Sequence, residues 1–274
     1  MRPPRRARAA TASSSSTALI TGASSGIGSE IARELARRGH GVTLVARRDQ
    51  RLRELATELA DGHGVRAEVI SADLGQEAER DRVQAELAAL GLEVEILVNN
   101  AGFGNSAKVA EADRERLLSM VRLNCEALLD MQARYSPAMC DRGRGAIINV
   151  ASTAAFQPIP GTATYAATKA FVLSLTEATH AELRDAGVSA TALCPGPVKT
   201  EFTDVAGIGG AEEQLPGVFW TPVAEVARAA VEGAEKGKRV VVPGLLNRAG
   251  AITGQHTPRM VVLPFAKRLW RQAT

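Results

Sequence analysis

The stretch "ALITGASSGIGSEIARELARRG" (18–39) joins a short apolar run to a glycine-rich turn, and the turn to a segment of helical period. Gly22, Gly26 and Gly28 permit a tight turn and a close approach of other groups to the backbone. The helix behind them would present free N–H groups and the positive end of its dipole to an anion. Between a first strand and a first helix, this turn predicts a dinucleotide pyrophosphate site, although its Gly-x-x-x-Gly-x-Gly spacing differs from Gly-x-Gly-x-x-Gly.

Strand-like and helix-like segments continue to alternate along the rest of the chain. Short apolar runs lie at 18–21, 42–46, 67–72, 94–100, 145–152, 188–194 and 239–243. Between them, apolar residues repeat at helical spacing, as at Leu52, Leu55 and Leu59 and again at Val83, Leu87 and Leu90. The runs lack strict apolar–polar alternation, which is typical of strands buried on both faces. The sequence therefore predicts an α/β fold, a single Rossmann-type doubly wound domain with a mostly parallel sheet and helices on both faces.

Composition divides the chain into three parts. Residues 1–16 are mainly Arg, Pro, Ala and Ser, which predicts a disordered extension with nothing to bury. No linker or repeat interrupts residues 17–245, which we expect to form one domain that includes a substrate lid at about 201–220. Residues 246–274 form an apolar and basic tail. We expect the tail to pack on the domain, across the substrate mouth, or on a partner, but a helix that lies on anionic lipid would have a similar sequence.

Charge and cysteine content argue against several classes of protein. The 274 residues carry a formal net charge of only +3, and no basic stripe interleaved with aromatic side chains predicts a nucleic-acid partner. The three cysteines, Cys125, Cys140 and Cys194, have neither metal-ligand nor disulfide-framework spacing, so no metal site and a cytoplasmic location are expected. No apolar run reaches the roughly 18 residues of a transmembrane segment, so none is expected.

The segment "TYAATKAFVLSLTEATHAEL" (164–183) has the pattern of a mostly apolar helix, yet it carries Tyr165 and Lys169 near its start. Residues at i and i+4 of a helix stand on the same face, so the phenol and the ammonium would lie side by side. A lone pair of this kind is usually a surface pair at a fraying helix end. Its meaning depends on the other motifs of the chain.

Four motifs in this order resemble those of the short-chain dehydrogenases/reductases: "TGASSGIG" (21–28), "NNAG" (99–102), Ser152 with Tyr165 and Lys169, and "PGPVKT" (195–200). The resemblance covers roughly residues 17–245. "LVARRDQRLRELATEL" and "ALCPGPVKTEF" are most similar to a bacterial NADP-type subgroup. The resemblance implies a seven-stranded Rossmann-type sheet that binds NAD or NADP at the carboxyl ends of its strands. It also suggests a homodimer or homotetramer.

The resemblance gives the Tyr165–Lys169 pair a chemical reason. Hydride transfer to a carbonyl needs a proton donor, and a free tyrosine, with a pKa of about 10, holds its proton too tightly near neutral pH. The ammonium of Lys169 would lower the pKa of Tyr165, and in the family this lysine also binds the nicotinamide ribose. By the same resemblance, Ser152 hydrogen-bonds the substrate carbonyl oxygen, and Asn124, in the helical stretch "MVRLNCEALL", holds a water that links the lysine to solvent. Without the family, Asn124 would be read as a solvent-facing helix residue and Ser152 as a strand-end serine.

The candidate cofactor-binding residues come from the turns that follow the predicted strands. They are Gly22, Ser24, Ser25, Gly26, Ile27, Gly28, Arg47, Arg48, Asp73, Leu74, Asn100, Ala101, Gly102, Tyr165, Lys169, Pro195, Gly196, Val198 and Thr200. An NAD enzyme of this fold usually ends its second strand with an acidic residue, whereas this strand runs into Arg47 and Arg48. We therefore expect NADP(H) to be preferred over NAD(H), with Arg47 at the 2′-phosphate and Arg48 as the second candidate.

The sequence is least informative about the substrate. Aromatic and aliphatic residues mark the expected pocket walls (Phe103, Phe156, Pro158) and the lid (Phe202, Leu215, Val218, Phe219, Trp220). They favour a small-molecule substrate that is an apolar carbonyl or alcohol, although such residues can also serve only to pack the lid against the body. We expect an NADP(H)-dependent carbonyl reductase or alcohol dehydrogenase. The alternatives are a 3-oxoacyl or other lipid-chain reductase at a membrane surface and, from another class, a catalytically silent nucleotide-sensing regulator.

Overall fold

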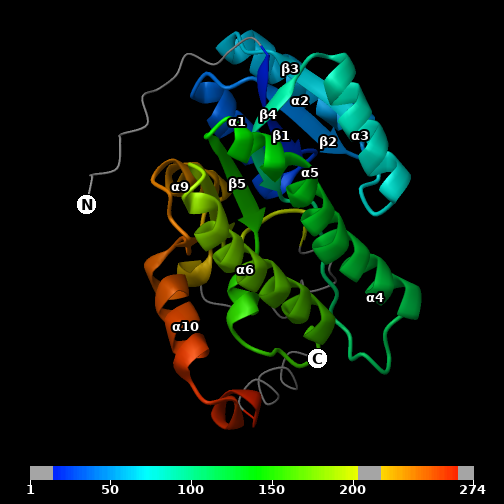
Figure 1. Cartoon of the computed structure of the whole chain (residues 1–274). Helices are drawn as coiled ribbons and strands as arrows, with labels where there is room; N and C mark the ends of the chain where they lie inside the picture. The colour runs from blue at the N-terminus through cyan, green and yellow to red at the C-terminus, as the bar shows by residue number, and fades with distance from the viewer. Residues whose placement is uncertain (1–14, 203–216, 265–274) are drawn as a thin grey trace, which may run out of the picture.

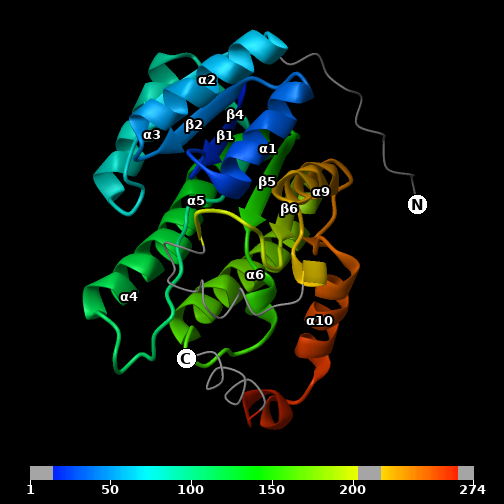
Figure 2. The same cartoon turned by 180° about the vertical axis from the view of Figure 1, so that it is seen from behind.

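The computed structural model describes residues 15–202 and 217–264. Three of the segments discussed above therefore lie outside the described residues: most of the N-terminal extension (1–14), most of the expected lid (203–216) and the end of the tail (265–274). The described residues contain one seven-stranded sheet with helices packed on both of its faces (Figures 1 and 2).

All neighbouring strands of the sheet run parallel, in the order β3-β2-β1-β4-β5-β6-β7. The strands are β1 (Ser16–Thr21), β2 (Val42–Ala46), β3 (Ala67–Ser71), β4 (Glu93–Asn99), β5 (Gly145–Val150), β6 (Val188–Leu193) and β7 (Val240–Val241). Each strand coincides with one of the seven apolar runs, so the predicted α/β fold is confirmed. The strand order reverses between β1 and β4, which is where open sheets of this kind bind ligands.

The helices cover the sheet in two layers. In chain order they are α1 (Gly26–Arg37), α2 (Asp49–His63), α3 (Glu77–Ala89), α4 (Arg114–Val121), the π-helical η1 (Arg122–Ala127), α5 (Leu128–Asp141), the short η2 (Thr153–Phe156), α6 (Ala163–Arg184), η3 (Gly217–Phe219), α9 (Val223–Glu235) and α10 (Leu245–His256). One buried cluster joins α1, α2 and α9 to the sheet, and another joins α3 and α5 to its other face. Figures 1 and 2 show α6 beside α5, with α10 at the edge of the molecule.

The helical repeats predicted from the sequence are confirmed with one exception. Leu52, Leu55 and Leu59 are buried in α2, and Val83 and Leu87 are buried in α3. Leu90 is the exception, because it caps the carboxyl end of α3 and is 38% exposed. Arg80 is buried on the same helix, three residues before Val83, so the inner face of α3 combines apolar residues with a cation.

A chain of neutral polar side chains crosses the centre of the sheet. Asn99 in β4 donates to Asn149 Oδ1 in β5 at 2.9 Å. Asn149 donates in turn to Gln132 Oε1 of α5 (2.8 Å) and to Thr176 Oγ1 of α6 (2.9 Å). All four residues are at most 4% exposed. Because buried amides are costly unless they are paired, this chain fixes the register of β4 and β5 relative to α5 and α6.

Candidate active site

A cleft of about 1110 Å³ lies at the carboxyl ends of the strands and spans the reversal of strand order. Most of the predicted site residues line it. They are Gly22, Ser24, Ser25, Gly26, Ile27, Arg47, Arg48, Asp73, Leu74, Asn100, Ala101, Gly102, Ser152, Tyr165, Lys169, Pro195, Gly196, Val198 and Thr200. Gly28 and Asn124 do not line the cleft. Their contacts place them immediately behind its wall, where they support residues that do.

The glycine turn is tied to the loop after β4 through Thr21 and Asn100. Thr21 Oγ1 accepts the backbone N–H of Asn100 (2.9 Å) and of Ala101 (3.0 Å). Asn100 Nδ2 donates back to the carbonyls of Thr21 (2.9 Å) and Gly22 (3.2 Å). A Cβ on Gly28 would lie 2.5 Å from Asn100 Nδ2, so only glycine allows this approach. The turn and the loop therefore form one rigid floor.

The amino end of α1 suits an anion. The cap residue Ser25 makes no hydrogen bond from its side chain to the first turn, and no acidic residue lies in that turn. The first N–H groups of a helix have no partner within the helix, and here they face the cleft beside Gly26 and Ile27. Gly26 has φ +58, and a Cβ there would meet the side chain of Thr200 at 3.2 Å. These features leave room for a pyrophosphate between the turn and the loop after β6.

Arg47 and Arg48 follow β2 and play different parts. Arg48 reaches across the glycine turn, where its guanidinium donates to Ser24 Oγ (2.9 Å) and Ser25 Oγ (2.7 Å). It also forms an ion pair with Glu201 at 2.7 Å. Within residues 15–202 and 217–264, the Arg47 guanidinium has no recorded hydrogen bond or ion pair, although it lines the same cleft. Arg47 is therefore the more available cation for a phosphate group, and Arg48 braces the turn.

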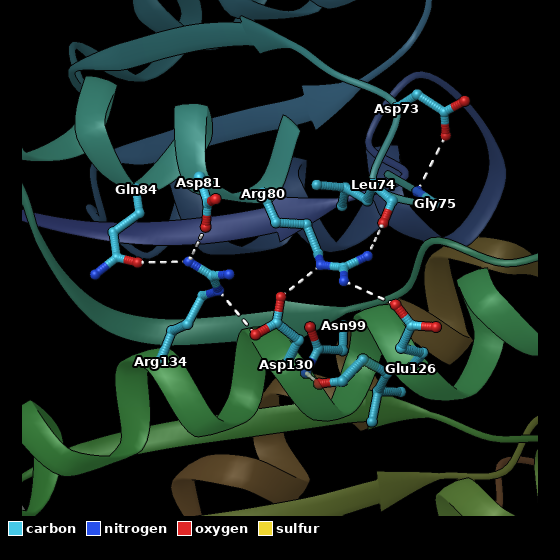
Figure 3. A network of polar contacts seen from close by, with 11 residues as sticks. Asp73, Leu74, Gly75, Arg80, Asp81, Gln84, Asn99, Glu126, Asp130 and Arg134 are labelled. Carbon is cyan, nitrogen blue, oxygen red and sulfur yellow. Dashed lines mark hydrogen bonds and ion pairs between the residues drawn. The ribbon is translucent and has the colours of Figure 1, made fainter. Parts of the chain in front are cut away.

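A buried arginine holds the loop after β3 in place (Figure 3). Arg80, 2% exposed, donates to the Leu74 carbonyl at 2.9 Å and forms ion pairs with Glu126 and Asp130 at 2.9 and 2.5 Å. Asp73 accepts the backbone N–H two residues further on at 3.1 Å. The candidate adenine-binding residues Asp73 and Leu74 are thus anchored to the helix layer below. Sequence reasoning missed Arg80, whose only signal is its place on the apolar face of a helix.

Asn124 lies in the π-helical segment η1 and is 1% exposed. Its Oδ1 accepts the N–H of Phe103 (3.1 Å), while its Nδ2 donates to the Phe103 carbonyl (2.9 Å) and to Thr168 Oγ1 (3.1 Å). The solvent-facing reading of Asn124 is therefore wrong. Asn124 joins the loop after β4 to α6, and a Cβ on Gly102 would lie only 2.9 Å from Asn124 Oδ1. The asparagine thus points inward from a π-helical turn, a feature that is frequent at functional sites.

Lys169 and Tyr165 stand on the cleft side of α6. Lys169 is 5% exposed and donates from Nζ to the Val150 carbonyl at the end of β5 (2.8 Å). Its Nζ lies 5.8 Å from the centroid of the Tyr165 ring, so the i, i+4 spacing does place the two groups together. Burial lowers the pKa of Lys169 to about 8. The Tyr165 ring also contacts the Phe202 ring, with centroids 5.6 Å apart.

Ser152 and the loop after β6 complete the wall around Tyr165. Ser152 follows β5 and caps η2, and its Oγ accepts the N–H of Ala154 at 3.0 Å. Its hydroxyl hydrogen remains available for an acceptor in the cleft, because Oγ is the acceptor in that bond. The Pro195 carbonyl accepts the N–H of Thr153 at 2.9 Å, so this loop is fixed against η2.

The mouth of the cleft partly matches the expected apolar walls. Phe103, Phe156, Phe202 and Phe219 line the cleft as expected. The expectation for Pro158 is wrong, since its neighbours Gln157 and Ile159 line the cleft instead. The backbone is extended at Gln157, and alternate residues of extended chain point to opposite sides.

Two residues expected in the lid also do not line the cleft. Val218 is 67% exposed on η3, and the Trp220 ring lies 5.7 Å from Lys199 Nζ. Leu215 lies outside the described residues. Sequence reasoning missed other lining residues: Arg116 of α4, Arg122 of η1, and Leu246, Asn247 and Gly250 of α10. These come from segments with no motif, so only the packed structure brings them to the cleft.

Two features are absent from the part of the chain that the structure describes: a metal-binding cluster and a membrane-spanning helix. Across residues 15–202 and 217–264, no group of three or more His, Cys, Asp or Glu side chains is arranged to hold a metal ion. Over the same residues, no helix combines the length and apolar character that crossing a bilayer requires.

The chain matches known proteins over most of its length. Residues 16–207 match the family model described as short chain dehydrogenase. A short-chain dehydrogenase from Sphingobium yanoikuyae, solved in complex with NADPH, is 37% identical with a TM-score of 0.77, covering 90% of this chain and 95% of that one. The bulky-bulky ketone specific alcohol dehydrogenase from Comamonas testosteroni is 33% identical with a TM-score of 0.73, covering 92% of each chain.

A similar curated protein has a longer chain. The very-long-chain 3-oxoacyl-CoA reductase of Anas platyrhynchos is 34% identical over 195 residues, which is 69% of this chain and 62% of that protein. The match therefore spans about three fifths of the reductase's length.

Proposed function

The chain belongs to the short-chain dehydrogenase/reductase family and is an oxidoreductase, and from that premise we propose that it interconverts bulky apolar ketones and secondary alcohols with NADP(H). The observation that carries the proposal is the Tyr165–Lys169 pair on one face of α6, open to the cleft at Tyr165 and buried at Lys169. The pair lies between the glycine turn on one side and an apolar mouth on the other.

The residues of the cleft fit a dinucleotide. The uncapped amino end of α1 and the glycine turn would hold the pyrophosphate, Asp73 and Leu74 the adenine, and Lys169 the nicotinamide ribose. When bound, the nicotinamide supplies or accepts the hydride. Arg47 supports the choice of NADP(H), because its guanidinium, which has no partner among the described residues, matches a phosphate in charge and geometry, and no carboxylate ends β2.

The polar residues around Tyr165 take separate roles in moving the proton. In the reducing direction the Tyr165 hydroxyl donates its proton to the carbonyl oxygen, while the Ser152 hydroxyl hydrogen-bonds the same oxygen. The charged Lys169 ammonium stabilises the phenolate that remains until it is reprotonated from solvent. Asn124 positions Phe103 and α6 around the pair through its three hydrogen bonds.

The proposed substrate class rests on the lining of the mouth. Four phenylalanines and Ile159 provide apolar walls, and Gly250 leaves space beside Leu246. The similar Comamonas enzyme is described as specific for bulky-bulky ketones, which agrees with a wide apolar mouth.

We also propose a homodimer or homotetramer through α5 and α6, where Leu129 and Phe171 are exposed by 43% and 40%.

A 3-oxoacyl thioester reductase is the second candidate function. It is favoured by the similarity to the very-long-chain 3-oxoacyl-CoA reductase and by Arg116 and Arg122 at the cleft, which could meet an anionic carrier group. A nucleotide-sensing regulator without turnover is disfavoured, because a protein that only binds has no use for Tyr165 beside a buried lysine.

Turnover can be screened by following NADPH absorbance with aldehydes, ketones, alcohols and 3-oxoacyl-CoA esters of several chain lengths. The proposal predicts the highest kcat/KM for ketones with large apolar groups on both sides of the carbonyl. A higher kcat/KM for the thioesters would select the second candidate. Tight NADPH binding without turnover of any compound would favour the regulator.

A further inference from the structure

Helix α10 contacts the rest of the protein through a polar side chain and exposes large apolar ones, which is the reverse of an ordinary surface helix. Its inner face carries Asn247 and Ala251, 8% and 4% exposed, and Asn247 Nδ2 donates to the Phe219 carbonyl (3.1 Å) and to Thr221 Oγ1 (3.2 Å). The opposite face carries Leu245 and Ile252, which are 87% and 52% exposed. Surface helices normally bury their apolar stripe and expose their polar one. Here the helix is held by an amide and presents its apolar stripe outward.

The exposed apolar surface continues beyond α10. The chain is helical again over 259–264, and Met260, Val261 and Leu263 are exposed by 87%, 60% and 42%. With Leu246 at 45%, six of the twelve exposed large hydrophobic side chains in the described residues lie between 245 and 263. Isolated exposed leucines are normal, but a concentration of this kind marks an interaction surface. Both figures show these segments, orange to red, at the periphery of the molecule.

The charge of this region identifies the partner. From Leu245, where α10 begins, to Thr274 the sequence has no Asp or Glu and five basic residues: Arg248, Arg259, Lys267, Arg268 and Arg271. On α10, Arg248 lies next to the exposed apolar face by helical geometry. A second copy in a two-fold contact would bring this basic surface against itself. An anionic bilayer instead offers acyl chains to the leucines and phosphates to the arginines.

We propose that α10 and the helical segment 259–264 dock on the surface of an anionic membrane, with Leu245 and Ile252 entering the boundary between headgroups and acyl chains. The hydrogen bonds of Asn247 to Phe219, the last residue of η3, and to Thr221 then hold α10 with its apolar face outward. Leu246 and Gly250 lie on the flank of the same helix and line the cleft, so the mouth would open beside the membrane. The docking does not depend on turnover.

The test is cosedimentation of the full chain with vesicles of phosphatidylcholine alone or mixed with phosphatidylglycerol. We expect binding only to the anionic vesicles, and weaker binding as salt is raised. Leu245→Asp and Ile252→Asp should each lower the fraction of protein bound to the anionic vesicles by about tenfold, because each replaces an apolar side chain of the docking face by a negatively charged one. Leu90→Asp is the matched control, because Leu90 is an exposed leucine just before β4, at the other end of the sheet.

Circular dichroism and thermal unfolding would show that each variant is folded, and neither Leu245 nor Ile252 lines the cleft. Absence of binding to the anionic vesicles, or an equal loss in Leu90→Asp, would overturn the proposal. A change of sedimentation coefficient in the two α10 variants without lipid, together with no vesicle binding by the wild type, would assign the surface to a second copy instead.

Discussion

The two ends of the cleft are built in different ways. The end proposed to hold the cofactor is fixed by hydrogen bonds that involve backbone groups, such as the two that Asn100 donates to Thr21. The end proposed to hold the substrate is assembled from η2, η3 and α10, which lie far apart in the sequence, and it is lined largely by apolar side chains. Its polar tie is the Asn247 side chain, which joins α10 to the residues around η3.

The difference teaches where residue identity matters. Hydrogen bonds, and close contacts that only glycine allows, require particular residue types at fixed positions. An apolar wall requires only side chains of suitable total volume. Substitutions at the cofactor end and at the Tyr165–Lys169 pair should therefore have large and specific effects. Substitutions at the mouth should have smaller effects that depend on the size of the substrate.

The largest effect is expected for Tyr165→Phe. The substitution removes the transferable proton and keeps the ring that packs on Phe202, so turnover should fall by about 10²- to 10⁴-fold while NADPH binding stays within error. Steady-state kinetics and a fluorescence titration of NADPH measure the two quantities.

The control for this substitution is the other tyrosine of the chain, Tyr135. Tyr135 on α5 is 9% exposed, its hydroxyl has no hydrogen-bond partner among the described residues, and burial raises its pKa to about 12. Tyr135→Phe should leave turnover unchanged and slightly raise the free energy of unfolding, because it removes an unpaired buried hydroxyl. Equal losses of turnover in the two variants would contradict the catalytic role proposed for Tyr165.

The sequence was informative where geometry demands particular residues. The glycine turn, the "NNAG" loop and the Tyr165–Lys169 spacing were visible because each needs fixed residue types, and the structure brings them to one cleft. Arg80 and Gly250 were not visible, because their roles depend on what packs against them from distant parts of the chain. Likewise, the partners of Asn124 could not be derived from the sequence, since a π-helical turn sets the direction of its side chain.

Cofactor choice should show the next largest effect. If Arg47 meets the 2′-phosphate, a charge-assisted hydrogen bond of about 1.5–3 kcal/mol predicts a roughly ten- to hundredfold preference for NADPH over NADH in kcat/KM. Arg47→Asp should reverse the preference by removing an attraction and adding a repulsion.

The matched control is Arg53→Asp, which makes the same charge change on α2 at a side chain that is 65% exposed and outside the cleft. Its ratio of kcat/KM values should equal that of the wild type. A wild-type enzyme that uses both cofactors equally well would sink the argument for Arg47.

The charge of Lys169 should make NADPH affinity depend moderately on pH. Burial disfavours the ammonium and brings its pKa to about 8, so Lys169 is mostly charged below pH 8 and loses its charge as the pH rises through that value. NADPH affinity should therefore fall above about pH 8, by up to about tenfold for loss of one charged hydrogen bond to the ribose. Lys169→Met should bind more weakly at pH 7 and show no such step. A step of the same size in both proteins would assign it to another group.

The smallest effect is expected at the mouth. A Cβ on Gly250 would meet no atom within 4 Å, and Gly250 lines the cleft, so Gly250→Leu should fit the helix and narrow the opening. We expect kcat/KM to fall by about tenfold for bulky ketones and to change little for small aldehydes. Gly62→Leu is the control, since Gly62 lies in α2 with equally open space but outside the cleft. An equal fall for large and small substrates would show that the mouth does not select by size.

The most direct test of the central claim is the transfer of deuterium to a bulky ketone from NADPH that carries deuterium at both hydrogen positions of nicotinamide C4. With the wild-type protein, the proposal predicts one deuterium on the carbinol carbon of the product, detected by mass spectrometry. It predicts no product above background with Tyr165→Phe in the same time. Contradiction would come from a wild-type alcohol product without label, or from labelled product formed as fast by Tyr165→Phe as by the wild type.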